Sequence, residues 1–494
     1  MAHPKETAVA VLLGAAIILV LPLLNGGPFF YFDTATYIEQ LAKAVDVLFG
    51  SETAAVTGQE GAAAGVSGAS GGTQFGARQG DRIVVGGRSI YYSALAYAGW
   101  ITTVWLPVAV QALTLSWLVL ALLRHLGTRH WALVGCATLA GIAIFSSASL
   151  FAGLITPDIW AGPMILALAL LWGTGDTLGR GERLVLLAVL SFAVLVHASH
   201  LALLAALVVL YGLGRLVTRG RHGAPLRPLW LPLAALAIGI GGSLAFSVAV
   251  RVLYGGEMLS LPFISAHLVE LGPGTRLLRE TCPQGTYALC AHLDRLPTDW
   301  ISFLFDRSAD GGGFATADAA QRRAIVGEQV RFALDTLAFD PVATVSGLVR
   351  DGVSQLWTLS MHDVALTTAN RRFVTTSFPP DLARLIEGSA VFDNPWTLQA
   401  LLRATQLTAA LSAVLVCAWA LGRARTPGAV LEGRDRVILV LVAGVVLNAL
   451  ICGILASPYG RFQARLVWLL PLGAALIIVA PTFRRARPLF QRQV

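Results

Sequence analysis

Two aspartates stand where a charged side chain is costly, because each lies beside a long apolar run. Asp33 follows the first apolar run, and Asp158 follows Pro157 between the third and fourth runs. An ionisable group with so little polar sequence around it is a functional candidate by default, and a carboxylate serves as a general base. Helix capping is the alternative, because Asp at a helix start accepts bonds from backbone N–H groups and favours the helix dipole.

Arginines form the second group of candidates. Arg461 and Arg465 lie four residues apart in the polar segment Ser457–Arg465, between the last two apolar runs. A cation at a helix start faces the unfavourable end of the dipole, so an anionic partner would compensate it. Guanidinium groups bind phosphate bidentately, which favours a lipid phosphate. Headgroup anchoring is the alternative. Arg88, just before the second run, is a weaker candidate of the same kind.

Tyrosines and histidines accompany these charges. His197 and His200 are three residues apart, so on a continuous helix they would share a face and could bind a metal or a phosphate oxygen. Interfacial anchoring of the tyrosines and a satisfied interfacial histidine pair are the alternatives. The residues that we take as candidates for substrate binding are Tyr37, Tyr91, Tyr92, His197, His200 and Tyr459.

Cysteine placement points to one disulfide. Three of the five cysteines, Cys136, Cys417 and Cys452, lie inside apolar runs, whereas Cys282 and Cys290 share a polar segment. Their spacing closes a short loop over a Pro-Gln-Gly turn, which suits a disulfide if the segment is periplasmic or extracellular. Two unpaired thiols remain the alternative.

The composition indicates that these residues are positioned by membrane helices. Of the 494 residues, 56% are hydrophobic and only 13% are charged, about half the charged fraction of a soluble domain. The net charge of +8 comes from basic clusters that flank apolar runs. Such clusters orient membrane spans, and they lack the interleaved aromatics of a nucleic-acid surface, so we expect no nucleic-acid partner.

We expect an all-α polytopic membrane protein with about ten transmembrane helices, each of about 20 apolar residues. The two runs beside His197 could instead form one long or broken helix. The runs are Ala8–Leu24, Thr103–Leu123, Trp131–Phe151, Ile159–Trp172, Leu184–Val196, Leu201–Leu216, Leu229–Val252, Leu401–Leu421, Val437–Leu455 and Val467–Thr482. The first run lacks a cleavage site and is expected to remain as an anchor.

We expect the membrane to be a bacterial inner (plasma) membrane. Basic loops predict that both termini are cytoplasmic. This orientation puts two polar stretches outside and gives three parts. Residues 1–252 form an N-terminal transmembrane module with a first extracytoplasmic loop at 25–102, residues 253–400 an extracytoplasmic domain, and residues 401–494 a C-terminal transmembrane module. Gly/Ala/Ser-rich residues 57–80 look like a mobile loop. Juxtamembrane helices on the outer face and a mainly helical domain, with a helix near Ala317–Ala333, are expected.

The order of these motifs resembles the GT-C class of membrane glycosyltransferases, which includes protein O-mannosyltransferases and the aminoarabinose and galacturonic acid transferases of lipid A. Asp33–Tyr37 matches the Asp-x-x-x-Tyr element after the first span. Pro157-Asp158 matches the acidic second loop, and Arg461–Pro471 matches the final Arg-containing loop before a Pro-bearing helix. The likeness covers about Ala8–Trp230 and the C-terminal region. Many relatives have a second acid where this chain has Thr34, which weakens metal binding there.

The resemblance implies transfer of a sugar from a polyprenyl-phosphate donor to a lipid, glycan or protein acceptor on the extracytoplasmic face. Asp33 would be the base, and Asp158 would orient the acceptor or assist a divalent metal, whose identity the sequence leaves unknown. Arg461 and Arg465 would stabilise the leaving phosphate. We therefore expect the two aspartates and the arginine pair to converge on one cavity at the non-cytoplasmic edge of the bilayer.

Two other classes compete with this interpretation. A transporter or flippase of a lipid-linked or small anionic substrate would place ionisable groups near the midplane and be built from repeats. A non-catalytic assembly subunit for polysaccharide export would make the charged pairs incidental. The candidate groups instead collect at one predicted rim, which favours the enzyme.

Overall fold

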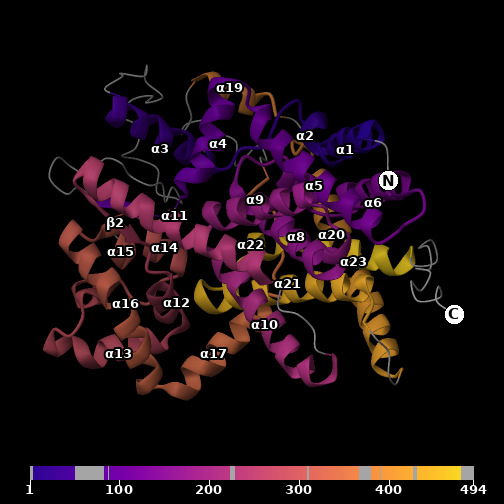
Figure 1. Ribbon diagram of the computed structural model, residues 1–494. Coiled ribbons are helices and arrows are strands. Elements are labelled where there is room, and N and C mark those ends of the chain that lie inside the picture. Colours follow the sequence, from indigo (N-terminus) through magenta and orange to yellow (C-terminus); the bar gives the residue numbers. More distant parts are fainter. Residues whose placement is uncertain are drawn as a thin grey trace.

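A computed structural model of the chain describes residues 4–49, 83–86, 88–222, 229–308, 311–365, 380–389, 391–426 and 431–479. Helices dominate these residues, which confirms the predicted all-α class (Figure 1). The predicted mobile loop at 57–80 lies outside the described residues.

The elements of the first half are α1 (Pro4–Ile18), α2 (Val20–Leu24), α3 (Phe32–Phe49), β1 (Ile83–Gly86), α4 (Ile90–Ile101), α5 (Trp105–His125), α6 (Trp131–Phe145), α7 (Ala148–Ala152), the 3₁₀ helix η1 (Pro157–Trp160), α8 (Ala161–Thr174), η2 (Gly175–Thr177), α9 (Arg180–Val196), α10 (Ala198–His222) and α11 (Trp230–Tyr254). The second half contains β2 (Glu257–Ser260), α12 (Phe263–Leu271), α13 (Pro273–Thr281), η4 (Cys282–Gln284), η5 (Ala288–Arg295), α14 (Trp300–Phe305), α15 (Gly313–Thr316), α16 (Ala319–Phe339), α17 (Pro341–Ser354), α19 (Pro380–Glu387), α20 (Pro395–Ala424), α21 (Gly433–Leu455), α22 (Gly460–Ala464) and α23 (Leu469–Ile478).

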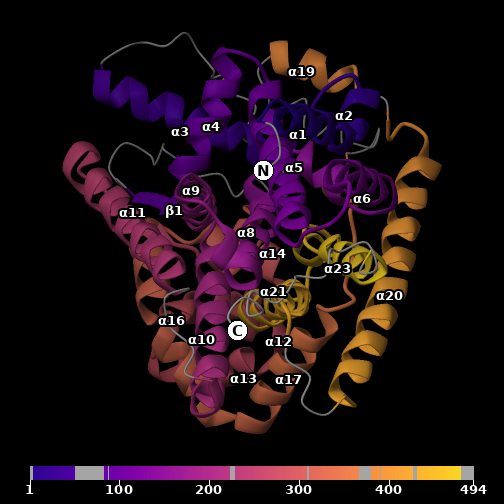
Figure 2. The ribbon, with the colours of Figure 1, turned by 45° about the vertical axis from the view of Figure 1, so that its right-hand side comes forward.

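Helix α8 is the centre of the larger core. All residues of Ala161–Thr174 are buried, as expected for a helix that is apolar all round. It packs against α5, α9 and α21. Helix α20 lies instead along one edge of the molecule (Figure 2), and only 17% of its most apolar stretch is buried. The apolar surface left on such a helix suits lipid rather than water.

Seven of the described helical segments are long and apolar enough to cross a membrane: Trp105–His125, Pro157–Thr177, Ala198–Leu216, Trp230–Leu253, Trp396–Ala424, Gly433–Leu455 and Gly460–Ile478. Each coincides with a predicted run, and together they indicate an integral membrane protein. The predicted number of about ten is not confirmed, because the other three runs form shorter helices. Two of these runs are interrupted, at Leu19 and at Ser146–Ser147. At the second break the Ser146 hydroxyl bonds back to the carbonyl of Ile142, a bond that competes with the helix ladder.

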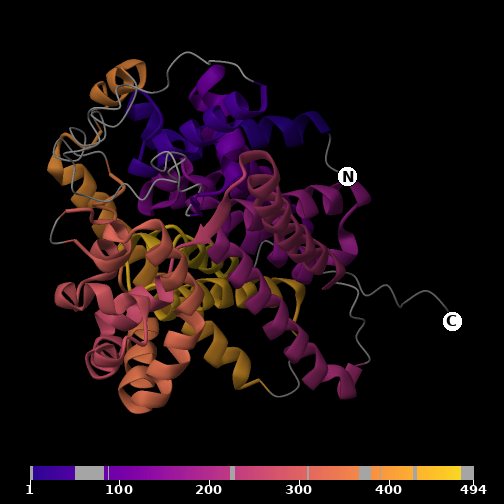
Figure 3. The ribbon, with the colours of Figure 1, turned by 90° about the vertical axis from the view of Figure 1, so that its left-hand side faces the viewer.

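A second hydrophobic core lies in residues 257–354, which we call the helical module (Figure 3). Phe303 and Phe332 are at its centre, both nearly fully buried. The predicted helix near Ala317–Ala333 is confirmed as α16, which begins at a capping box of Asp318 and Gln321. Strands β1 and β2 pair in parallel, so residues after the first apolar run join the start of the module. This small sheet was not predicted.

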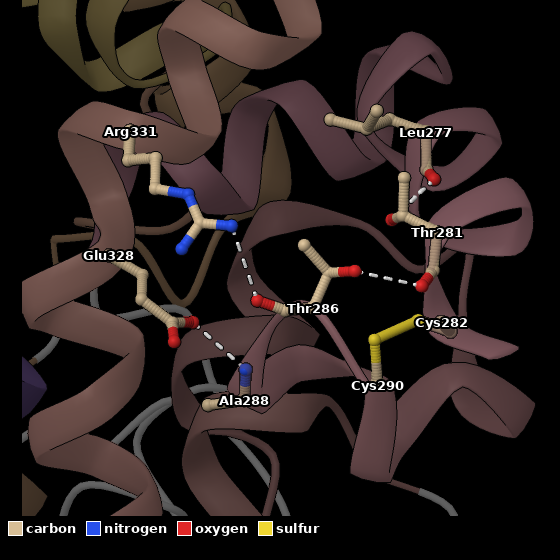
Figure 4. Close-up of a disulfide and its surroundings, with 8 residues drawn as sticks. All are labelled: Leu277, Thr281, Cys282, Thr286, Ala288, Cys290, Glu328 and Arg331. Atoms are coloured by element: carbon tan, nitrogen blue, oxygen red, sulfur yellow. Dashed lines mark hydrogen bonds between the residues drawn. A yellow bond between two sulfur atoms is a disulfide. The ribbon is translucent and has the colours of Figure 1, made fainter. Parts of the chain in front are cut away.

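The disulfide predicted from the cysteine spacing is present. Cys282 and Cys290 are bonded across the loop that follows α13 (Figure 4). The loop is also held at both ends, because Thr286 donates to the carbonyl of Thr281 at 2.9 Å and the Ala288 N–H donates to Glu328 on α16 at 2.8 Å. The loop is thus fixed to the rest of the helical module.

Candidate functional site

Backbone pairing brings the two predicted aspartates together. Phe29 forms a parallel bridge with Leu154, and its N–H and C=O bond to Gly153 and Ile155 at 2.8 and 3.0 Å. Thr34 adds a side-chain bond to the carbonyl of Ile155 at 2.9 Å. The chain before α3 and the chain before η1 therefore run side by side, so Asp33 and Asp158 end in one region.

Arg461 joins the two carboxylates. Its Nε lies 3.3 Å from Asp158 Oδ1, and one terminal nitrogen lies 3.7 Å from Asp33 Oδ2. The guanidinium also sits 4.5 Å from the centre of the Tyr31 ring, in a cation–π contact. Burial raises the pKa of Tyr31 to about 12, although Arg461 opposes the shift. This phenol is therefore neutral at physiological pH.

Arg465 contacts the same oxygen of Asp158 as Arg461 does. Its side chain is fully buried, with one nitrogen 3.5 Å from Asp158 Oδ1 and the other 3.0 Å from both Ser199 Oγ and Asn448 Oδ1. Asp158 is not an N-cap residue, because the N-caps of η1 and α8 are Thr156 and Trp160; it lies in the first turn of η1. Its carboxylate contacts both arginines.

Arg88 completes the ionic network, because its guanidinium bonds directly to Asp33. Both side chains are largely buried, with 13% and 7% exposed. Asp33 lies in the first turn of α3, and its carboxylate is shared between two arginines from distant parts of the chain. We call Asp33, Asp158, Arg88, Arg461 and Arg465 the ionic cluster.

The two predicted histidines lie beside the cluster, at a break between helices. Helix α9 ends at Val196 and α10 begins at Ala198, with His197 in extended backbone. Their ring centres are 4.9 Å apart and the rings stack. His197 Nδ1 lies 2.8 Å from the hydroxyl of Ser199, the same hydroxyl that Arg465 contacts. His200 Nδ1 lies 2.9 Å from the carbonyl of Ala193.

The predicted tyrosines divide into two groups. Tyr37 and Tyr92 are buried, with ring centres 5.0 Å apart in an edge-to-face contact between α3 and α4. Tyr92 donates to Gln111 Oε1 at 2.9 Å. Tyr91 points elsewhere, because its hydroxyl donates to the carbonyl of Gly242 on α11 at 2.8 Å. The structure therefore gives Tyr37 and Tyr92 a supporting position and does not bring Tyr91 to the cluster.

A third carboxylate, which was not predicted from the sequence, lies in this region. Asp363 follows α17 in a segment whose neighbours Met361 and Val364 are buried in the larger core. Its carboxylate is hydrogen-bonded to the hydroxyl of Tyr459 and interacts electrostatically with Arg461. Burial raises the pKa of Asp363 above its ordinary value, with Arg461 and Tyr459 opposing the shift. No predicted span lies beside Asp363, so the sequence did not single it out; its position depends on how α17 packs.

The turn that carries the arginines is tightly fixed. Gln355, at the end of α17, accepts from the Tyr459 N–H at 2.6 Å and donates to its carbonyl at 3.0 Å. Gly460 has no room for a side chain, since an added Cβ would lie 2.5 Å from the backbone nitrogen of Ser360. Ser457 has a φ of +91°, a conformation that costs energy in non-glycine residues and persists where surrounding contacts enforce it.

Several buried polar atoms at the site have no hydrogen-bond partner among the described residues. They include His200 Nε2, Asp363 Oδ2 and Arg465 Nε. Leaving such an atom unpaired costs about 1–3 kcal/mol. A polar ligand that supplied partners to these atoms would remove that cost.

Within the described part of the chain, no three His, Cys, Asp or Glu side chains come close enough to hold a metal ion. Asp33 and Asp158 face arginines instead. Comparisons with protein families, curated proteins and solved structures found no match. A function for this chain is therefore proposed from its own residues and their geometry.

Proposed function

We propose that this chain is a membrane glycosyltransferase that moves a sugar from a polyprenyl-phosphate donor to a lipid, glycan or protein acceptor. The observation that carries the proposal is the buried bridge from Arg461 to both Asp33 and Asp158. This bridge supports the resemblance to GT-C enzymes, which rests on three sequence motifs. The three motifs lie far apart in the chain, and one charged residue from each takes part in the bridge.

The arginines are the groups that would bind the donor phosphate. Arg88, Arg461 and Arg465 provide three cations against the carboxylates of Asp33 and Asp158. An incoming phosphate competes for guanidinium groups, which bind it in bidentate fashion. Once the phosphate binds Arg461 and Arg88, these arginines no longer donate to the Asp33 carboxylate. The carboxylate can then accept a proton.

The transfer step then follows. The acceptor hydroxyl oxygen attacks the anomeric carbon, and the bond from that carbon to the phosphate oxygen breaks with its electron pair on the phosphate. Asp33 takes the hydroxyl proton. Arg461 and Arg465 stabilise the negative charge that develops on the polyprenyl phosphate, and donors fixed in advance are effective in a site that excludes water. Asp158 holds both arginines in place.

Stability alone is a weak reason for such a cluster. Desolvation of buried ions often offsets their attraction, so apolar residues of similar volume stabilise a fold as well or better. A binding or catalytic role explains why five charged side chains are gathered there.

We also propose that the cluster and the helical module face the extracytoplasmic side, with both termini cytoplasmic. The basic loops support this orientation. So does the Cys282–Cys290 disulfide, because disulfides persist in oxidising compartments. A bacterial inner membrane and a total of about ten spans, with α1–α2, α6–α7 and α9 as the three additional ones, complete the proposal.

Purified protein in liposomes, incubated with a panel of radiolabelled polyprenyl-phosphate sugars, tests the activity. We expect one donor to be consumed, with label transferred to an acceptor lipid or hydrolysed to free sugar. The Asp33→Asn variant should insert and fold but lose transfer. Movement of intact donor across the liposome membrane, with no donor cleaved, would instead identify a flippase. Full transfer by Asp33→Asn would remove that residue from the mechanism.

A further inference from the structure

We infer that one face of α17 contacts the acyl chains of the bilayer, so the helical module is partly embedded rather than wholly outside the membrane. The face consists of Val342, Val345, Val349 and Val353, which are 78%, 50%, 53% and 38% exposed. Their spacing of three or four residues places them on one side of the helix. This inference does not depend on the proposed sugar transfer.

The place of α17 in the fold supports lipid as the partner. Helix α17 packs along α21, which is one of the candidate spans. The two approach closely near the end of α21, where Gly453 lies against the backbone of Asp351 and Gly352 lies against Ile454. The last turns of a membrane span are at membrane depth, so the outward face of a helix packed on them meets lipid.

The length and continuation of α17 fit entry into one leaflet. Its 14 residues span about 21 Å. This length is enough to pass through one leaflet of about 15 Å but too short to cross the whole hydrocarbon core of about 30 Å. Helices α16 and α17 together are long and apolar enough to cross a membrane, but the chain bends by 113° between the two helices. Beyond α17, Met361 and Val364 enter the larger core. Trp357, 68% exposed, follows the valine face, and tryptophan is enriched at membrane interfaces.

Helix α20 offers a comparison inside the same chain. It exposes Leu407, Leu411 and Val414 at 65%, 71% and 69%, at the same helical spacing, on a helix that qualifies as a span. The valine face of α17 therefore has the pattern of a lipid-facing surface. A water-facing helix of a membrane-distal domain would carry polar residues there.

Fluorescence quenching tests the contact. Val345→Cys and Val349→Cys are made in a Cys136→Ala, Cys417→Ala background, labelled with bimane and reconstituted into liposomes whose lipids carry a nitroxide on the acyl chain. Glu280→Cys on α13, at an exposed polar position, is the matched aqueous control. The Cys136→Ala single variant, which keeps the exposed Cys417 of α20, is the lipid-facing reference. The label bound by the background protein is subtracted.

We expect the nitroxide lipids to quench the label at 345 and 349 several-fold more than at 280, and to a degree similar to that at 417. Iodide in the buffer should show the opposite order. Quenching at both valine positions equal to that at 280 would overturn the inference. So would protection from both quenchers, which would indicate a second copy of the chain or another protein on this face. Two independent positions guard against one label that disturbs packing.

Discussion

The ionic cluster and the surface of the helical module hold their charges in different ways. In the cluster, Asp158 and Arg465 are both 1% exposed, and each carboxylate is shared by two arginines. On the helical module, Arg276 and Asp340 form a pair whose side chains are 50% and 31% exposed. Exposed pairs typically contribute about 0–1 kcal/mol, whereas a buried ion left without its partner is strongly destabilising.

The two regions therefore differ in what their ion pairs contribute to stability, and this difference bears on function. The module can lose an ion pair with little effect, because water replaces the missing partner. The cluster cannot, although an apolar core of the same volume would serve stability equally well. An arrangement that is costly to disturb and unnecessary for stability fits a site that exchanges one anion, a carboxylate, for another, a phosphate.

Removing one arginine from each region gives the largest expected effect. Arg461→Met leaves Asp33 and Asp158 buried with fewer partners, so we expect a loss of about 3–5 kcal/mol in the free energy of unfolding. Arg276→Met, the matched control, should lose less than about 1 kcal/mol. Chemical denaturation in detergent measures both. Equal losses would contradict the difference between the two regions.

Opening the disulfide tests the helical module by itself. Cys282→Ser combined with Cys290→Ser removes a cross-link over a separation of 8 residues, which corresponds to about 2–3 kcal/mol of loop-closure entropy. Limited proteolysis should show earlier cleavage within 257–354, while donor binding by the ionic cluster remains. Loss of donor binding with an intact transmembrane core would mean that the site depends on the module more than its contacts indicate.

A smaller, pH-dependent effect is expected at Asp363. Burial raises the pKa of this carboxyl in the folded state, so the folded protein binds the proton more tightly than the unfolded chain does. The native protein therefore loses stability as the pH rises from about 3.9 through the raised pKa. The amide introduced by Asp363→Asn cannot ionise, so the Tm of this variant relative to that of the native protein should rise over this window. A constant difference between about pH 3.5 and pH 7 would contradict the shift.

Much of the fold could be predicted, because long apolar runs are read from local sequence. The helices from α5 to α23 that qualify as spans all fall on predicted runs. The interrupted runs show the limit, since the break at Ser146 depends on a side-chain bond as well as on hydropathy. The path of α17 along α21 was not predictable, because it depends on glycines fitting between helices far apart in sequence.

The candidate site followed the same rule. Asp33, Asp158, Arg461 and Arg465 could be predicted because ionisable groups at the predicted outer rim, with mainly apolar sequence around them, are costly and therefore conspicuous. Asp363 and Asn448 were missed, the first because no predicted span lies beside it and the second because an uncharged amide inside a span gives little signal. Tyr91 was included for its neighbours in sequence, and its hydroxyl binds α11 instead. Local sequence reveals which groups are costly to bury, and packing decides which ones meet.

The central claim is that Arg461 binds the donor phosphate. Native mass spectrometry of the detergent-purified protein with a polyprenyl phosphate measures this directly, and Arg461→Lys is the informative variant because it keeps the charge but loses the bidentate fork. We expect the native chain to retain the lipid and Arg461→Lys to lose most of it, while Arg276→Lys on the helical module binds as the native chain does. Equal retention by the native chain and Arg461→Lys would contradict the claim.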